Sequence, residues 1–147
     1  MKAVLQRVSQ AKLHIDNKET ANINRGLVIF LGISNTDDHE TALKLLDKIV
    51  KLRIFADDTG KINLSVSDID GEVLIVSQFT LYADTKKGNR PSFINVAEPN
   101  KAEELYEYFV NAAKFKFKKV GEGVFGANMQ VNLTNDGPFT IVLEINQ

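Results

Sequence analysis

Two stretches decide the fold of this sequence: Val73-Leu74-Ile75-Val76-Ser77-Gln78-Phe79-Thr80-Leu81 and Asn135-Asp136-Gly137-Pro138-Phe139-Thr140. The first begins with four consecutive apolar residues, which predict a strand buried on both faces within the extended segment 72–81. Polar residues then interleave with Phe79 and Leu81 at its carboxyl end. This end is either a pocket floor that carries hydroxyls and an amide or an ordinary core strand whose hydroxyls are bonded internally.

The second stretch stands between two alternating segments, residues 129–133 and 139–145, so it predicts a corner between two strands. A plain hairpin needs only Asn-Gly or Asp-Gly at such a position. The additional Pro138 fixes its own φ and lacks an amide donor, so this residue pairs with no carbonyl at the corner. The corner is therefore either an ordinary turn or a place where free carbonyls meet a ligand.

The segments before the first stretch predict strands and one helix. Residues 4–15 largely alternate in polarity and are followed by turn residues 16–18, which favours two antiparallel strands. A continuous apolar run from Gly26 to residue 33 predicts a central strand. Asp37 and Glu40 have the spacing of a capping box, and the amphipathic helix that they open is expected to end near residue 52.

A second helix and further strands are predicted after the first stretch. Asn100 and Glu103 form another capping-box pattern, followed by an apolar stripe within residues 102–113. Phe115 and Phe117 then alternate with lysines, which predicts a change from helix to strand. The order is strand–strand, then strand–helix twice, then three strands. We predict one α/β domain spanning residues 1–147, with a β-rich, barrel-like body and two helices on one face.

Composition limits the classes of function. The chain of 147 residues has 44% apolar and 25% charged residues, which are ordinary values for a globular domain. The absence of cysteine excludes disulfides, thiolate zinc sites and a cysteine nucleophile. The sequence shows no signal peptide and no apolar run of the roughly 20 residues that a membrane helix needs. We therefore expect a cytoplasmic protein without a membrane partner, in which a net charge of −1 leaves polyanion binding to local patches.

Few side chains are suited to acid–base chemistry. The only histidines are His14 and His39, and we expect both to be structural or surface residues. No metal site and no phosphate-binding glycine loop is indicated, so we expect neither a metal nor another cofactor. Thr80 is the obvious nucleophile, but no activating base is visible beside it. An enzyme built from these residues would rely on positioning and on backbone amides around a developing oxyanion, acting on an activated ester.

Basic residues gather in the loop after the first stretch and in residues 114–119, which follow the second helix. Each group is either a solvated face or a patch that follows a phosphate backbone. The second interpretation makes Phe125 or Met129 a contact for a base. The basic loop residues are Lys86, Lys87 and Arg90.

Both stretches resemble the signatures of the D-aminoacyl-tRNA deacylase family. Ser-Gln-Phe-Thr-Leu occurs intact at residues 77–81, and Asn-x-Gly-Pro-x-Thr occurs intact at residues 135–140. The two signatures together, in order and at this chain length, make the resemblance specific. Further similar segments lie along the whole chain: Ala3-Val4-Leu5-Gln6-Arg7-Val8, Leu52-Arg53-Ile54-Phe55, Gly60-Lys61-Ile62-Asn63-Leu64-Ser65 and Gly88-Asn89-Arg90-Pro91-Ser92-Phe93.

The resemblance implies a cytoplasmic homodimer that hydrolyses the ester between a D-amino acid and the terminal adenosine of a tRNA. It also implies removal of glycine mischarged on alanine tRNA. It further implies a cis Gly137–Pro138 peptide that reaches into the partner's pocket, although only about 5–6% of X-Pro bonds are cis. The expected groups are catalytic Ser77, Gln78, Phe79 and Thr80; chiral-selection residues Asn135, Gly137, Pro138 and Thr140; an adenosine pocket of Phe125 and Met129; and a tRNA-backbone contact of Lys86, Lys87 and Arg90.

Under this hypothesis the carbonyls of Gly137 and Pro138 bind the substrate's α-amino group. The main chain at this corner then collides with the side chain of an L-amino acid, whereas the side chain of a D-amino acid points to solvent. Glycine has no side chain to collide and is therefore also accepted. Two alternatives stay open from the residues alone. One is a covalent threonine hydrolase that uses Thr80, and the other is a non-catalytic RNA-binding domain of the same fold.

Overall fold

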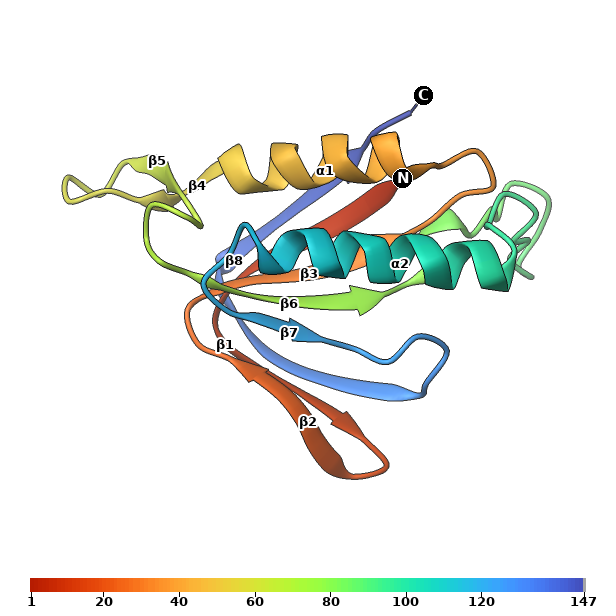
Figure 1. Cartoon of the computed structure of the whole chain (residues 1–147), viewed down its shortest axis with the longest axis horizontal. Coiled ribbons are helices and arrows are strands. Elements are labelled where there is room, and N and C mark those ends of the chain that lie inside the picture. Colours follow the sequence, from red (N-terminus) through yellow and green to blue (C-terminus); the bar gives the residue numbers. More distant parts are fainter. Residues whose placement is uncertain (147) are drawn as a thin grey trace.

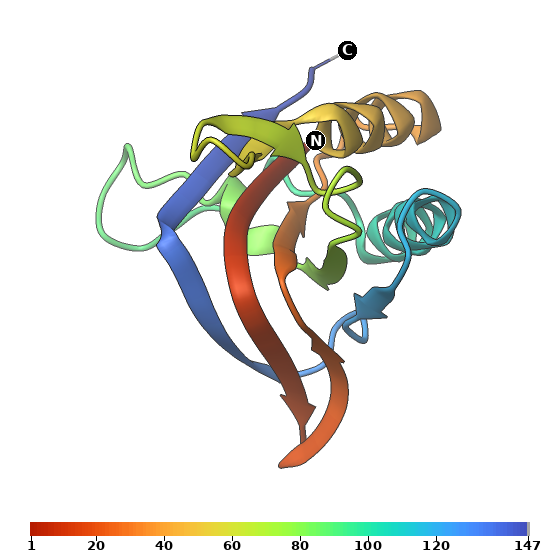
Figure 2. The same ribbon diagram turned by 90° about the vertical axis from the view of Figure 1, so that its left-hand side faces the viewer.

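The computed structural model describes residues 1–146 and shows a strongly curved sheet with two helices against one side (Figure 1). Figure 2, turned by 90°, shows the curvature that makes the sheet nearly barrel-like. This confirms the predicted α/β class with a β-rich body and two helices on one face. The elements are β1 (Lys2–Ile15), β2 (Lys18–Ile23), β3 (Gly26–Gly32), α1 (His39–Lys51), β4 (Arg53–Ala56), β5 (Ile62–Ser65), β6 (Glu72–Ser77), the 3-10 helix η1 (Phe79–Tyr82), α2 (Pro99–Lys114), β7 (Val120–Glu122) and β8 (Met129–Glu144).

The long strand β1 organises the sheet. Along one edge it pairs antiparallel with β3 in its first half and with β2 in its second half, while β8 pairs with almost all of its other edge. The β1–β2 hairpin turns at Asp16 and Asn17, which both have a positive φ (50° and 61°), as the favoured two-residue hairpin turn requires. The predicted turn is confirmed, but the residues before it form one long strand, and its partner β2, which follows the turn, was not assigned from the sequence.

Strands β3 and β6 form the centre of the sheet and run parallel. Val73 to Val76 are buried, as expected of a strand covered on both faces. Gly26 permits their close approach, because a Cβ at this position would lie 1.7 Å from the carbonyl oxygen of Glu72. One apolar core lies between the sheet and the helices, and a second lies inside the curve of the sheet: Val8, Ala11, Leu13, Ile23, Val28, Leu74 and Val76.

The predicted strand 72–81 is too long. Strand β6 ends at Ser77, and the chain turns into η1 directly after Gln78. The amide of Gln78 still donates to the carbonyl of Leu31 at 2.8 Å, but β3 ends one residue later, so no neighbouring strand remains to pair with. Phe79 to Tyr82 therefore form a helical turn rather than strand.

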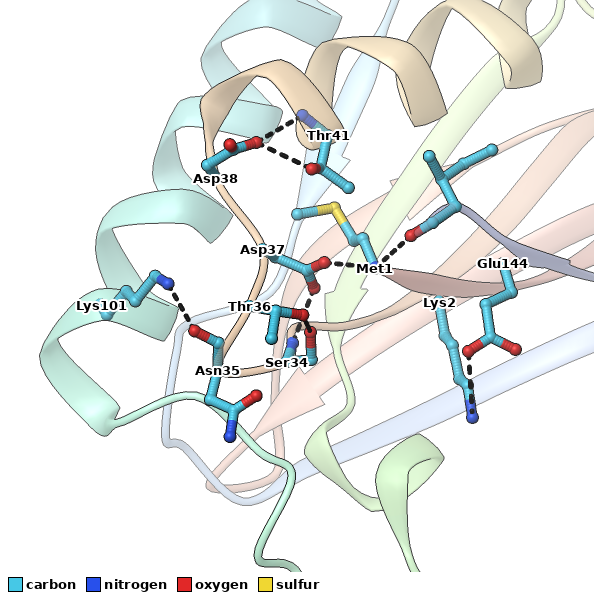
Figure 3. Close-up of polar contacts among 11 residues, drawn as sticks. Met1, Lys2, Ser34, Asn35, Thr36, Asp37, Asp38, Thr41, Lys101 and Glu144 are labelled. Carbon is cyan, nitrogen blue, oxygen red and sulfur yellow. Dashed lines mark hydrogen bonds and ion pairs between the residues drawn. The ribbon is translucent and has the colours of Figure 1, made fainter. Parts of the chain in front are cut away.

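Both predicted capping boxes are wrong in detail. Asp38, not Asp37, caps α1 and accepts from the Thr41 amide at 2.8 Å, while Asp37 is buried beside the chain's first residue (Figure 3). Helix α2 begins at Pro99, whose missing amide needs no cap, and its N-cap residue makes no side-chain bond, so Asn100 and Glu103 are not a box. The predicted C-terminus of α1 near residue 52 and the buried stripe of α2 are confirmed.

Residues 115–118 form turns and not the predicted strand. The amide of Phe117 returns to the carbonyl of Ala113 at 3.0 Å and closes the end of α2. Phe115 is 91% exposed, so its alternation with lysine does not reflect a buried face. The strand in this region is the short β7, which begins at Val120, two residues after this segment.

The second signature stretch is not a turn between two strands. Strand β8 continues from Met129 to Glu144 against β1, and its register shifts where Asn135 lies opposite Val8 and Thr140 lies opposite Gln6. The hexamer is therefore a large bulge in one strand, with residues 136–139 opposite Arg7 alone. As a result, the chain ends in two strands, β7 and β8, instead of the predicted three. The small β4–β5 hairpin, which turns through residues 57–60, was not predicted as strands.

Candidate active site

A cavity of about 600 Å³ opens where β6 leaves the sheet. Its wall on this side is formed by Ser77, Gln78 and Phe79, and Phe125 and Met129 also line it. The structure thus brings three predicted catalytic residues together with the predicted adenosine pocket. The other lining residues are Phe30, Leu31, Ile33, Val76, Val96, Ala97, Pro99, Ala102, Gly126, Ala127, Asn128 and Val131.

None of the described residues that line this cavity carries an ionisable side chain. Its polar groups are the hydroxyl of Ser77, the amides of Gln78 and Asn128, and the main chain. The first residues of a helical turn leave their amides without a partner inside that turn, which applies here to Phe79 and Thr80. The site can therefore offer neutral hydrogen bonds and backbone dipoles to a reacting group.

Thr80 lies beside the cavity and does not line it. Its hydroxyl accepts a hydrogen bond from the side-chain amide of Gln78. Within residues 1–146 this hydroxyl has no hydrogen bond to a histidine, a lysine or a carboxylate. The side chain of Gln78 is in turn oriented by its contact with Thr80.

The two histidines have other partners, as expected of structural or surface residues. His14 lies 3.4 Å from the side-chain amide of Asn132 and 4.0 Å from the Glu19 carboxylate. His39 lies 3.3 Å from the Glu104 carboxylate and packs edge-on against Tyr108, linking α1 to α2. In the part of the chain that the structure describes, no three His, Cys, Asp or Glu side chains are grouped as metal ligands. No helix in these residues is long and apolar enough to cross a membrane.

Tyr106 of α2 holds the segment that carries Phe125, a role that the sequence did not reveal. Its hydroxyl oxygen lies 3.0 Å from the carbonyl of Ile75 and 2.9 Å from the carbonyl of Gly123, so its one proton is shared between the two. Its ring lies 6.1 Å from that of Phe125. Burial raises the pKa of the Tyr106 phenol well above its usual value of 10.0, so the donor stays protonated at neutral pH.

The Asn135–Thr140 bulge is built as a supported corner. The side chain of Asn135 accepts from the Phe139 amide at 2.9 Å and donates to the Thr140 hydroxyl at 3.1 Å. These bonds place two predicted selection residues behind the corner, while Gly137 and Pro138 are exposed at its tip. The peptide bond between them is cis, as the resemblance implied.

Arg7 of β1 supports the same corner and was missed as a site residue. Its Nε donates to the carbonyl of Asp136 at 2.9 Å, its Nη1 donates to the carbonyl of Ile54 at 2.8 Å, and its guanidinium lies 4.5 Å from the Phe139 ring centre. One signal was available in the sequence. The apolar residues that are buried in β1 shift from odd to even positions and back around this residue: Ala3 and Leu5, then Val8, then Ala11 and Leu13. Such a change indicates a bulge.

The corner does not line the cavity of its own chain. Gly137 lies eight positions after the cavity residue Met129 in the same strand, which corresponds to about 25 Å along an extended strand. The structure therefore separates the predicted catalytic and adenosine-pocket residues at the cavity from the predicted chiral-selection residues at the exposed corner.

The predicted tRNA-contact residues lie in a loop beside the cavity. The loop is closed by paired main-chain bonds between Asp84 and Ser92, at 2.8 and 2.9 Å. Next to it, Phe93 packs edge-on against Phe79 with ring centres 5.0 Å apart. Among residues 1–146 no ion pair involves the three loop cations Lys86, Lys87 and Arg90.

The other basic segment differs, because three of its four lysines form ion pairs on the surface. Lys114 lies 2.6 Å from the Glu122 carboxylate, Lys116 lies 3.6 Å from Asp47, and Lys119 lies 3.2 Å from Glu72. These contacts favour the interpretation of a solvated face for this segment.

Comparisons with known proteins agree with the two signatures. A family model described as D-Tyr-tRNA(Tyr) deacylase matches residues 4–144. Proteins named D-aminoacyl-tRNA deacylase are 49% identical in Flavobacterium johnsoniae, over 98% of this chain and 97% of the relative, and 53% identical in Deinococcus deserti, over 99% of both.

Two solved structures share the fold. One, named c-Myc DNA Unwinding Element Binding Protein, superposes with a TM-score of 0.95 at 39% identity, over the whole of both chains. The other, described as a probable eukaryotic D-amino acid tRNA deacylase, has a TM-score of 0.85 at 19% identity over 98% of both chains, which shows the fold alone. With its family match and its close relatives, this chain belongs to the D-Tyr-tRNA(Tyr) deacylase family of enzymes.

Proposed function

We propose that the protein hydrolyses the ester bond of D-aminoacyl-tRNA and releases the free D-amino acid. The observation that carries this proposal is the cavity without ionisable side chains, lined by Ser77, Gln78 and Phe79 and by Phe125 and Met129. Its volume of about 600 Å³ lies within the range of about 300–1,000 Å³ that is usual for small-ligand sites. The terminal adenosine would occupy the Phe125–Met129 side, and the ester would lie against Phe79 and Thr80.

The absence of a base among the lining residues is consistent with an ester substrate. An aminoacyl ester is already activated, so positioning and oxyanion stabilisation can supply most of the rate. Backbone amides of Phe79 and Thr80 would hold the carbonyl oxygen as it becomes an oxyanion. The ribose 2′-hydroxyl beside the ester would position or activate the attacking water.

The contacts of Thr80 argue against covalent catalysis by its hydroxyl. A threonine nucleophile needs a base that removes its proton. Here Gln78 donates to that oxygen, and Thr80 does not line the cavity. We therefore give Thr80 a positioning role through Gln78.

We propose that the Gly137–Pro138 corner enters the cavity of a second copy of the chain. The corner is supported from behind by Arg7 and Asn135, yet its tip is exposed and lies away from its own cavity. In a homodimer, the carbonyls of Gly137 and Pro138 would bind the substrate's α-amino group. An L side chain would then meet main chain, whereas a D side chain would reach solvent and glycine would be accepted.

The loop cations are the proposed contact for the tRNA backbone. Lys86, Lys87 and Arg90 lie beside the cavity in a loop closed by its own main-chain bonds, and no ion pair among the described residues neutralises them. Phosphate contacts of this kind orient a nucleic acid without reading its sequence. We place the enzyme in the cytoplasm, where its substrate is made.

The activity is tested by following deacylation of D-tyrosyl-tRNA and L-tyrosyl-tRNA, with a D-tyrosyl-tRNA that carries a 2′-deoxy terminal adenosine as a third arm. We expect rapid release from the first, background release from the second and slow release from the third. Met129→Ala should raise KM, while Leu133→Ala, further along β8 and outside the cavity, should not. Binding of tRNA without release would instead favour a non-catalytic nucleic-acid-binding protein, a function that the name of the solved structure at 39% identity suggests.

The shared site is tested by mixing two inactive variants. Gly137→Ala damages the corner and leaves the cavity intact, whereas Phe79→Pro removes an amide that is proposed to hold the oxyanion and leaves the corner intact. If the corner serves the partner's cavity, a re-equilibrated mixture should recover about a quarter of the wild-type activity, because half of the dimers carry one complete site out of two. If each corner serves its own chain, no activity should return.

A further inference from the structure

The α-ammonium of Met1 is enclosed where β1, β8 and the loop before α1 meet (Figure 3). Its nitrogen lies 2.5 Å from Oδ1 of Asp37 and donates to the carbonyl of Ile145 at 2.7 Å. Met1 and Asp37 are each only 1% exposed. The Met1 carbonyl also accepts from the Ile145 amide at 2.9 Å, so the residue is held on both sides of its Cα.

The same carboxylate fixes the loop that follows β3. The other oxygen of Asp37, Oδ2, accepts from the amide of Ser34 at 2.7 Å. The amide of Asp37 in turn donates to the carbonyl of Ser34 at 3.2 Å. The two oxygens of one buried carboxylate thus bind the ammonium of Met1 and the main chain of this loop.

This loop is joined to a wall of the cavity. Ser34 forms a β-bridge with Val96, and the amide of Ala97 donates to the carbonyl of Ile33 at 3.1 Å. Ile33, Val96 and Ala97 all line the cavity. On the exposed side of the loop, Lys101 of α2 donates a hydrogen bond to the carbonyl of Asn35 at 2.8 Å (Figure 3).

We propose that the free α-ammonium of Met1 is a positioning group for the cavity, and that acylating or extending this nitrogen loosens the wall formed by Ile33, Val96 and Ala97. Acylation converts the ammonium into a neutral amide, so Asp37 becomes a buried carboxylate without a counter-ion. The added group also has no free space, because the side chain and the nitrogen of Met1 are enclosed.

This proposal goes beyond the proposed deacylase function, and only its kinetic test rests on that function.

The first test compares two extensions and two substitutions. A Gly-Ser dipeptide is added before Met1 in one protein and after residue 147 in its control. Asp37→Asn is compared with Asp38→Asn, which makes the same charge change at a residue where asparagine is an equally good helix cap. We expect the N-terminal extension and Asp37→Asn to shift the folding equilibrium by about a hundredfold or more, the usual effect of breaking a buried ion pair, and the two controls to shift it little.

The second test locates the effect and separates positioning from general destabilisation. Amide hydrogen exchange at Ser34 and Ala97 should accelerate in the extended protein, and KM for D-tyrosyl-tRNA should rise with kcat nearly unchanged. Combining the N-terminal extension with Asp37→Asn should cost less than the sum of the two changes, because either one alone already breaks the pair.

Equal stability and equal exchange in the N-terminally and C-terminally extended proteins would overturn the proposal. A loss of stability without a change in exchange at Ala97 or in KM would overturn the positioning role. Should Asp37→Asn fail to fold, the pair of extended proteins still decides. Should no variant hydrolyse the ester, the proposed function fails, while stability and exchange still test this inference.

Discussion

The cavity floor, formed by Ser77, Gln78 and Phe79, and the Asn135–Thr140 corner both belong to signature segments, but they are held in different ways. The floor continues the buried strand β6, and β3 fixes Ser77 and Gln78 through the main chain. The corner is a bulge at the surface, and side chains from β1 and from its own ends fix it. The floor shapes a pocket in its own chain, whereas the corner is presented outwards. The role proposed for the corner, entry into the cavity of a second copy, would need rigidity without burial, and the side-chain bonds behind the corner can provide that rigidity.

The largest effect is expected from Gly137→Ala, which attacks the tip of the corner. Gly137 has a φ of +144°, and a Cβ there would lie 2.9 Å from the Phe139 amide nitrogen. We expect kcat/KM for D-tyrosyl-tRNA to fall by about a hundredfold, since a misplacement of about 1 Å can have that effect. Steady-state deacylation measures it.

Gly60→Ala is the matched control for this change. Gly60 also has a positive φ (+80°), but a Cβ there would meet nothing within 4 Å, and the residue is outside the cavity. It should lose similar stability, on the order of 1–3 kcal/mol, and keep its activity. Equal losses of activity in both variants would mean that the corner has no special role.

A smaller effect is expected from removing the support behind the corner. Arg7→Ala removes the bonds to the carbonyls of Asp136 and Ile54 and leaves the tip residues unchanged. We expect kcat/KM to fall by roughly tenfold, about 1.4 kcal/mol, with weaker rejection of L-tyrosyl-tRNA. Lys12→Ala, which removes only a surface contact to Glu19 on the neighbouring strand, is the control. Unchanged discrimination in Arg7→Ala would show that the corner is rigid without this arginine.

On the cavity side, Tyr106→Phe should act through stability and binding. It removes the hydroxyl whose proton is shared by two carbonyls, and we expect a loss of about 1–3 kcal/mol in the free energy of unfolding. KM should rise by a few-fold, because the segment that carries Phe125 loses its support. Urea unfolding and steady-state kinetics measure the two effects, with Tyr108→Phe as the control. A stability equal to that of the wild type would contradict the role of Tyr106.

Because the phenol of Tyr106 is buried, we also expect the stability of the protein to depend on pH in the alkaline range. Burial raises the pKa of Tyr106 above its usual 10.0, and burial with the nearby Asp37 carboxylate raises the pKa of Tyr82 to about 12. Above about pH 10 the unfolded chain loses these protons first. The contribution of the two phenols to stability should therefore be constant below pH 10 and fall as the pH rises further. Tyr106→Phe should reduce this fall, which unfolding measured between about pH 8 and pH 11 would detect.

The smallest effect is expected at Thr80. Thr80→Val removes the hydroxyl that orients the Gln78 side chain but no nucleophile, so kcat should fall by less than about tenfold. Single-turnover deacylation measures the chemical step directly. A near-complete loss of rate with intact tRNA binding would establish the covalent threonine mechanism instead.

The predictions from sequence succeeded where contacts are local or where one face is buried. The buried run at 73–76, the hairpin at residues 16–17 and the apolar stripe of α2 were all readable from periodicity. Short-range rules failed where two residues compete for one role. Asp37 and Asp38 are both plausible caps, and only the buried ammonium of Met1, 36 residues away in sequence, decides between them.

The candidate site was predicted in its parts but not in its arrangement. Both signature segments were identified from their residues, yet the strand assigned to residues 78–81 is a helical turn and the supposed turn at Asn135 is a bulge. Arg7 and Tyr106 were missed, because their partners lie 129 residues and 31 residues away in sequence. No local pattern contains such contacts.

The sequence by itself determined the α/β class, the buried central strands and the residue types available for chemistry, because hydrophobic periodicity and composition are properties of the chain alone. The tertiary structure decided that Ser77 and Met129 share one cavity while Gly137 lies outside it. It decided this because strand pairing sets which distant segments are adjacent, and the register of β8 against β1 sets where the corner points.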